Sequence, residues 1–193
     1  SELKTVDNLR PFVELNPYKD ALGKANQFVG YLPNAEDVTP DTSLGLDDMF
    51  EVVRKANEDY QELQEKKEKL KKKIDELRAK QQIIAPFRPL DCDLHKVLHY
   101  RYITYRFGRI AVEFYHKMQK YLMEDLKAIF VEGERDDSFV YGAYFVSPAE
   151  AQKVDAVFRS LHFERIELKD EFEGSPAYAY QSLEREIARV NLE

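Results

Sequence analysis

Apolar residues recur in a strict three-four step from Leu46 to Ile84, and neither glycine nor proline follows Gly45 in this stretch. The intermediate positions of this seam are apolar at Met49, Val53, Ala56, Tyr60, Leu63, Leu70, Ile74 and Leu77, and polar at Lys67 and Gln81. At roughly 1.5 Å per residue, such a helix would be about 58 Å long. The pattern therefore predicts one long coiled-coil helix over residues 44–85.

The preceding residues, 1–43, predict a short helix and a linker. Asn16 can cap a helix and Pro17 can occupy its first position, and apolar residues then recur at helical spacing from Tyr18 to Leu32. Residues 33–44 are polar and rich in helix breakers, so we expect a linker there. The helical segment has one broad apolar face and therefore needs a partner.

Residues 86–174 show a different pattern, in which aromatic and β-branched runs alternate with amphipathic stretches. We predict the elements in the order strand Tyr100–Ile110, helix Val112–Leu126, strands Ala128–Glu132 and Ser138–Val146, helix Ala149–Leu161, and strand His162–Leu168. This β-α-β-β-α-β order is ferredoxin-like: a four-stranded sheet carries two helices on one face. We expect the other face of the sheet to be exposed.

The last segment, 175–193, predicts a returning helix. Ser175 can cap it, Pro176 suits its first turn, and apolar residues recur at the spacing of the first seam. The predicted fold class is thus α+β, with a long antiparallel coiled-coil hairpin capped by a ferredoxin-like lobe. The return arm is only about 27 Å long, so we expect the seam from Leu46 to Leu63 to be unpaired and to favour a homodimer.

Composition narrows the possible functions. The net charge of −7 argues against a dedicated nucleic-acid or membrane-surface binder, because both need a basic face. No apolar run of about 18 residues is present, and the single cysteine cannot form an internal disulfide. With these features we expect a protein that lies inside the cell. The chain starts at Ser1 and ends within a helical pattern, so we also expect it to be part of a longer protein.

One group of residues resembles metal ligands. His95 and His99 are four residues apart and could share a helix face, with Cys92 nearby and aspartates to complete the set. The alternative is a short helix that leads into the lobe without a metal, which we favour because the chain has no cysteine besides Cys92. His116 and His162 are single residues on amphipathic elements, which packing explains.

RNA binding is a second possibility, because ferredoxin-like sheets with aromatic faces can stack bases. The strand Tyr141–Val146 has the glycine and aromatics of such modules but lacks the leading basic residue. Residues 84–174 contain 13 Lys/Arg and 16 Asp/Glu, and this net charge of −3 disfavours phosphate. We expect Arg106 and Arg109 to pair with carboxylates or to lie at a protein interface.

An enzyme is not expected. The sequence has no glycine-rich phosphate loop, no nucleophile elbow and no Ser-His-Asp spacing above chance. We therefore assign no catalytic residues and no cofactor. A generic coiled-coil scaffold, which acts by binding other proteins, is a further alternative.

Several strings resemble one family in their order along the chain. They are Tyr105–Ile110, Tyr141–Val146, Phe163–Leu168 and Gly174-Ser175-Pro176, with Leu9–Glu14 and Asn16-Pro17-Tyr18 upstream. Together they resemble the cytoplasmic N-terminal region of V/A-type ATPase subunit I, equivalent to V-ATPase subunit a. In that family, two α/β lobes are joined by a long coiled-coil hairpin on the cytoplasmic side of the membrane.

The resemblance implies a non-catalytic stator role in ATP-coupled proton or sodium transport. Residues 1–43 would hold a remnant of the proximal lobe, 44–85 the outbound helix, 86–174 the distal lobe and 175–193 the shortened return helix. The implied partners are peripheral-stalk subunits E and G or H at the distal lobe, and central-stalk and rotor subunits through the missing proximal region. The absent C-terminal domain would provide the membrane contact. Candidate interface residues are Arg106, Arg109, Tyr141, Tyr144 and Arg165.

Overall fold

The computed structural model describes residues 19–31 and 45–193. Two compact units divide the chain between Lys69 and Leu70, and helix α2 (Leu46–Ile84) runs through this boundary. The fold contains both helices and a four-stranded antiparallel sheet, so the predicted α+β class is confirmed. The predicted cap at Asn16 and the linker after Leu32 lie outside the described residues.

In the first unit, α1 (Lys19–Gly30) is followed by Tyr31, whose ring stacks on that of Tyr60 in α2. The ring centroids are 4.5 Å apart, and Asn57, one turn earlier in α2, is buried. The expectation that the seam between Leu46 and Leu63 lacks any partner within the chain is therefore wrong around Tyr60. Leu63 itself is 64% exposed, so the buried stripe of α2 does not follow the predicted seam throughout.

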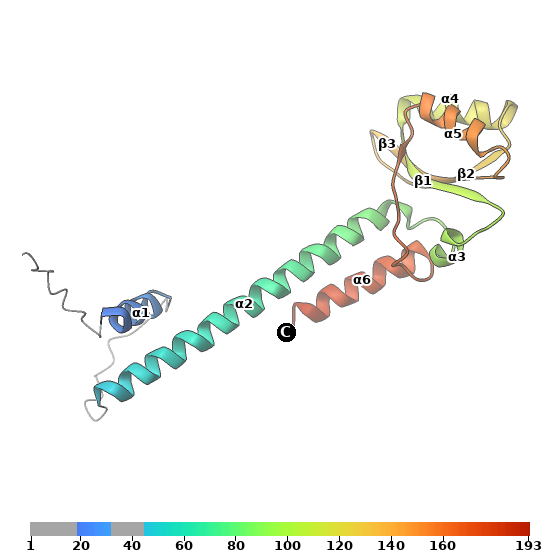
Figure 1. Cartoon of the computed structure of the whole chain (residues 1–193). Coiled ribbons are helices and arrows are strands. Elements are labelled where there is room, and N and C mark those ends of the chain that lie inside the picture. Colours follow the sequence, from blue (N-terminus) through green and yellow to red (C-terminus); the bar gives the residue numbers. More distant parts are fainter. Residues whose placement is uncertain (1–18, 32–44) are drawn as a thin grey trace, which may run out of the picture. The chain divides into compact units, whose positions relative to one another are not determined.

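In the second unit, α6 (Pro176–Val190) lies beside the C-terminal part of α2 and runs antiparallel to it (Figure 1). Lys73 forms an ion pair with Glu186 at 3.5 Å, and Lys80 forms one with Glu171, before α6, at 2.7 Å. The apolar residues Leu77, Ala179 and Val190 are buried. Since Glu186 is only four residues from the end of α6, the return helix accompanies only the last part of α2.

The end of α2 and the start of α6 have local causes in the sequence. Pro86 lacks the N–H that another α-helical turn would need, so α2 ends at Ile84 and a short 3-10 turn, η1 (Ala85–Phe87), follows. At the start of α6, Ser175 Oγ accepts a hydrogen bond from the backbone N–H of Tyr178 at 3.2 Å. Gly174 has a φ of 69°, a backbone conformation that glycine adopts readily.

Between the two helices, residues 104–165 contain strands and helices in the predicted order. Each strand pairs with antiparallel neighbours in the order β2-β3-β1-β4, and helices α4 and α5 lie on one face of the sheet (Figure 1). The elements are β1 (Thr104–Ala111), α4 (Val112–Glu124), β2 (Ala128–Arg135), β3 (Phe139–Val146), α5 (Ala151–Ser160) and β4 (Glu164–Arg165). A further short helix, α3 (Leu94–Leu98), precedes β1.

Two predicted strands are longer than the observed ones. Residues 100–103 form a bend in which the Tyr102 side chain is exposed, so β1 starts at Thr104 rather than at Tyr100. The strand predicted for 162–168 pairs only at Glu164 and Arg165. After the Ile166 N–H donates to the Phe107 carbonyl, the chain leaves the sheet because Ile166 and Leu168 pack into a different cluster.

Two apolar clusters cover the two faces of the sheet. The first includes Ile110, Met118 and Phe158 and lies under α4 and α5. The second joins Phe107 and Ala143 of the sheet to Phe87 and to residues of α2, α3 and α6. The expectation that one sheet face is exposed is therefore wrong: the ends of the long helices and α3 cover it.

Gly108 provides the first test of this packing. A Cβ at this position would lie 2.3 Å from the Glu164 carbonyl oxygen and 2.5 Å from the Phe163 ring. Gly108→Ala should therefore lower the free energy of unfolding by about 2 kcal/mol, measured by urea denaturation. Gly23→Ala in α1, where nothing lies within 4 Å, is the control and should not destabilise. An unchanged urea midpoint for Gly108→Ala would contradict the close β1–β4 approach.

Candidate functional site

Three of the candidate interface residues meet at Asp155 of α5. The Asp155 carboxylate accepts hydrogen bonds from Tyr144 at 2.6 Å and from Arg106 at 3.3 Å, and Arg165 forms an ion pair with it at 2.7 Å. Arg106 also donates to the Tyr105 carbonyl oxygen at 2.8 Å. Because the Asp155 side chain is only 15% exposed, these contacts form a largely buried charge cluster.

The pKa values in this cluster have clear physical causes. Burial alone would raise the pKa of Asp155, but hydrogen bonds from Tyr144 and Arg165 and the charge of Arg106 lower it overall. Burial, followed by the hydrogen bond to Asp155, raises the pKa of Tyr144 well above its ordinary value. Asp155 therefore stays ionised and holds both arginines, so the cluster acts to join α5, β1, β3 and β4.

Tyr144 is fully buried in the structure, so it is a core residue and not a surface contact. Arg106 and Arg165 are partly exposed but already face a carboxylate. The Nε atom of Arg106 is buried without a hydrogen-bond partner among the described residues. The structure thus brings these three residues together, but around Asp155 rather than on an open face.

Arg109 and Tyr141 are placed differently, as cross-strand neighbours on β1 and β3. The Arg109 guanidinium contacts Glu164 of β4 at 2.6 Å and lies over the Phe139 ring, 4.0 Å from its centroid. Hydrogen bonds with Tyr141 and Glu164 raise the pKa of Arg109. Like the arginines around Asp155, Arg109 is partly exposed, with 34% of its side chain accessible, and here the cation lies on an aromatic platform.

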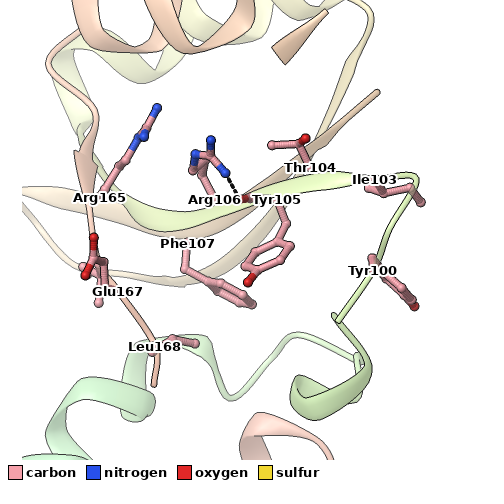
Figure 2. A pocket seen from close by; sticks show the side chains of 10 residues that line it. Tyr100, Ile103, Thr104, Tyr105, Arg106, Phe107, Arg165, Glu167 and Leu168 are labelled. Atoms are coloured by element: carbon pink, nitrogen blue, oxygen red, sulfur yellow. Dashed lines mark hydrogen bonds between the residues drawn. The ribbon is translucent and has the colours of Figure 1, made fainter. Parts of the chain in front are cut away.

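A cavity of about 500 Å³ lies along the first half of β1, where β4 does not pair (Figure 2). Tyr105 and Phe107 point to the side of α3 and α6, whereas Arg106 and Arg165 point to the opposite side of the sheet (Figure 2). Its other lining residues are Tyr100, Ile103, Thr104, Ile166, Glu167 and Leu168.

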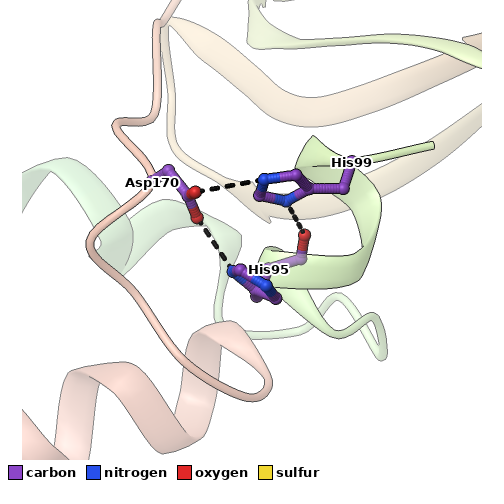
Figure 3. A group of neighbouring side chains, drawn as sticks. All are labelled: His95, His99 and Asp170. Atoms are coloured by element: carbon purple, nitrogen blue, oxygen red, sulfur yellow. Dashed lines mark hydrogen bonds and ion pairs between the residues drawn. The ribbon is translucent and has the colours of Figure 1, made fainter. Parts of the chain in front are cut away.

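The three metal-ligand candidates from the sequence, Cys92, His95 and His99, do not all lie together. His95 and His99 lie next to Asp170, from the segment between β4 and α6, and the possible ligand atoms all lie within 4.8 Å of one another (Figure 3). Cys92 does not join them: it is half-buried against the second apolar cluster, and burial, followed by the charges of Asp91 and Asp93, raises its pKa. Its thiol is therefore a poor ligand.

Sequence reasoning missed two central carboxylates. Asp155 had a recognisable signal, because it lies on the same face of α5 as the buried Val154 and Phe158, where a charge needs a partner. Asp170 had none, since its contact with His95 joins residues 75 positions apart. His116 and His162 are not part of either group.

The described residues thus define an α+β protein in which a lobe is fused to the adjoining ends of two antiparallel helices. Within residues 19–31 and 45–193, no helix is long and apolar enough to cross a membrane. No protein-family model matches the chain, and no curated protein matches its sequence.

One solved structure with a similar fold is the cytoplasmic N-terminal domain of subunit I, homologue of subunit a, of V-ATPase. The sequences are 14% identical and the TM-score is 0.47. The aligned region covers 90% of this chain and 60% of the other, so this chain spans only about three fifths of that domain.

Proposed function

We propose that this chain is a non-catalytic stator part of a rotary V/A-type ATPase, on the cytoplasmic side of the membrane. It would link the peripheral stalks to the membrane domain of a longer subunit and thereby support proton or sodium transport. The observation that supports this proposal best is the insertion of a βαββαβ lobe between two antiparallel helices, α2 and α6. Four of the six sequence strings that resemble the family fall on or beside β1, β3, β4 and the start of α6, and the two upstream strings lie outside the described residues.

In this proposal, residues 44–85 and 175–193 are the two arms of a coiled-coil hairpin and 86–174 are a ferredoxin-like distal lobe. Residues 1–43 are a remnant of a proximal lobe followed by a linker. A stator must transmit force from the lobe to the arms without bending at the joint. The second apolar cluster provides such a joint, because Ile84, Phe87 and Ala179 at the helix ends pack directly on Phe107 of the sheet.

The proposed contact with the peripheral stalk is the partly exposed group of Arg109, Phe139 and Tyr141. An arginine on an aromatic platform suits a protein interface, where both residue types are enriched. Arg109 keeps its orientation through Glu164 and Phe139, so little side-chain freedom is lost when a partner binds. The partner would be the heterodimer of stalk subunits E and G or H, with acidic residues facing Arg109.

Titration of this chain with that heterodimer tests the proposal. Arg109→Glu should weaken binding at least about tenfold, because it reverses the charge that faces the partner. Combining Arg109→Glu with Glu164→Arg keeps an ion pair within the lobe, so recovery of binding would assign the loss to the internal pair instead. Lys120→Glu, on the exposed side of α4, is the matched control and should bind normally.

Equal affinities for all four proteins would exclude Arg109 from the interface. Absence of any complex with the unmodified chain would argue for a coiled-coil scaffold outside rotary ATPases. Circular dichroism of each variant checks that the fold is kept.

A further inference from the structure

We propose that His95, His99 and Asp170 form a binding site for a divalent transition-metal ion of the zinc class. Nδ1 of His95 lies 3.0 Å from Oδ1 of Asp170, and Nε2 of His99 lies 3.3 Å from Oδ2 (Figure 3). In a tetrahedral zinc site with bonds of about 2.0–2.1 Å, two ligand atoms are about 3.3 Å apart. The two histidine–carboxylate distances are close to this spacing, and all three possible ligand atoms lie within 4.8 Å of one another. This inference does not depend on the proposed function.

The hydrogen bond on the other nitrogen of His99 defines which atom is the ligand. Nδ1 of His99 lies 2.8 Å from the backbone carbonyl oxygen of His95. A carbonyl oxygen can only accept, so Nδ1 carries the hydrogen and donates it. In a neutral ring, Nε2 then carries the lone pair, and this lone pair faces the Asp170 carboxylate. Metal-bound histidines commonly donate their second N–H to a backbone carbonyl in this way.

Two acceptors that face each other need a cation between them. At His99 Nε2 and Asp170 Oδ2, either a proton on the imidazole or a metal ion meets this need. Binding of the metal would displace that proton, and the displaced proton would pass to solvent.

The site rests on an anchored part of the fold. Both histidines belong to α3 and its C-terminal cap, and α3 is held by Leu94 and Val97, which are fully buried. The Leu94 N–H also donates to the Gly174 carbonyl oxygen at 2.8 Å, across to the segment that contains Asp170. An ion bound here would join α3 to the segment that leads into α6.

The donor set indicates the class of metal. Two imidazole nitrogens and one carboxylate oxygen suit zinc, cobalt or nickel, whereas calcium and magnesium prefer oxygen ligands alone. Three protein ligands at an exposed site leave a fourth position for water. We therefore expect a reversible site whose occupancy depends on the zinc concentration.

Calorimetric titration of the full chain with zinc chloride tests the site, with the imidazole C–H signals followed by NMR. We expect saturable binding of one zinc ion and shifts of the His95 and His99 signals. His99→Ala should weaken zinc binding by at least about tenfold, and Asp170→Asn should also weaken it. His116→Ala is the control and should bind zinc as the unmodified chain does.

Either of two results would overturn the proposal: no saturable binding below 1 mM zinc, or equal affinity in the unmodified chain and in a His95→Ala/His99→Ala variant. His95 and His99 are solvent-exposed, so these substitutions should preserve the fold. Magnesium chloride at the same concentrations should produce no shift of the histidine signals, and an equal response to magnesium would also contradict the assignment.

Discussion

Phe158→Ala should lower the free energy of unfolding by about 4 kcal/mol. Phe158 is only 1% exposed and lies at the centre of the first apolar cluster. Its ring centroid is 4.1 Å from that of Tyr144 and 5.3 Å from that of Phe163. Truncation to alanine removes both ring contacts and leaves a cavity that α5 and the sheet cannot readily close.

Urea denaturation followed by circular dichroism measures this loss. Tyr102→Ala is the matched control, because it removes an aromatic ring that is 86% exposed and should change stability by less than about 0.5 kcal/mol. A loss below about 1 kcal/mol for Phe158→Ala would show that α5 does not pack on the sheet as described.

Asp155→Ala should cost about 3 kcal/mol of unfolding free energy. The substitution leaves the cations of Arg106 and Arg165 without their shared carboxylate and the buried Tyr144 hydroxyl without its acceptor. The cost lies at the lower end for a broken buried ion pair, because both arginine side chains are partly exposed to water. Asp137→Ala in the exposed β2–β3 turn is the control.

The same carboxylate predicts a pH dependence. Its pKa is lower in the folded chain than the ordinary value of 3.8, so the unfolded chain binds the proton more tightly. The contribution of Asp155 to stability is therefore present above pH 3.8 and is lost as the pH falls through the lowered folded-state pKa. Asp155→Asn should lack this part of the acid-induced loss, and a parallel loss in both proteins would contradict the cluster.

The helices and the order of elements in the lobe could be predicted because their signals are local. The seam of α2, the proline that ends it and the Ser175-Pro176 start of α6 each lie within a few residues of the feature they determine. The limits of β1 and β4 could not be predicted. Ile166 and Leu168 have strand-like sequence, but they leave the sheet to pack beside Phe107, and only the tertiary fold determines that choice.

That helices cover the second face of the sheet could also not be predicted from the sequence. The aromatic residues of β1 and β3 fit an exposed nucleic-acid platform as well as they fit a buried joint. Phe107 and Ala143 are buried against the helix ends in the second cluster. Bases cannot stack on Phe107 while it is packed in this way.

The candidate site was only partly visible in the sequence. His95 and His99 could be paired from their spacing. Asp170 joins the histidines, and Asp155 joins the arginines, through contacts between segments that are distant in the sequence. The fold explains why Arg106, Tyr144 and Arg165 belong together. It places Arg109 and Tyr141 on a separate surface, which stays a predicted interface.

The proposed binding of this lobe to the peripheral stalk of a rotary ATPase can be measured by a sedimentation titration. The unmodified chain is titrated with the purified E–G heterodimer from the same organism. We expect a saturable one-to-one complex with a Kd of about 10 μM or tighter, in the range of modular protein contacts. Sedimentation of the two as separate species throughout, at concentrations up to about 100 μM, would contradict it.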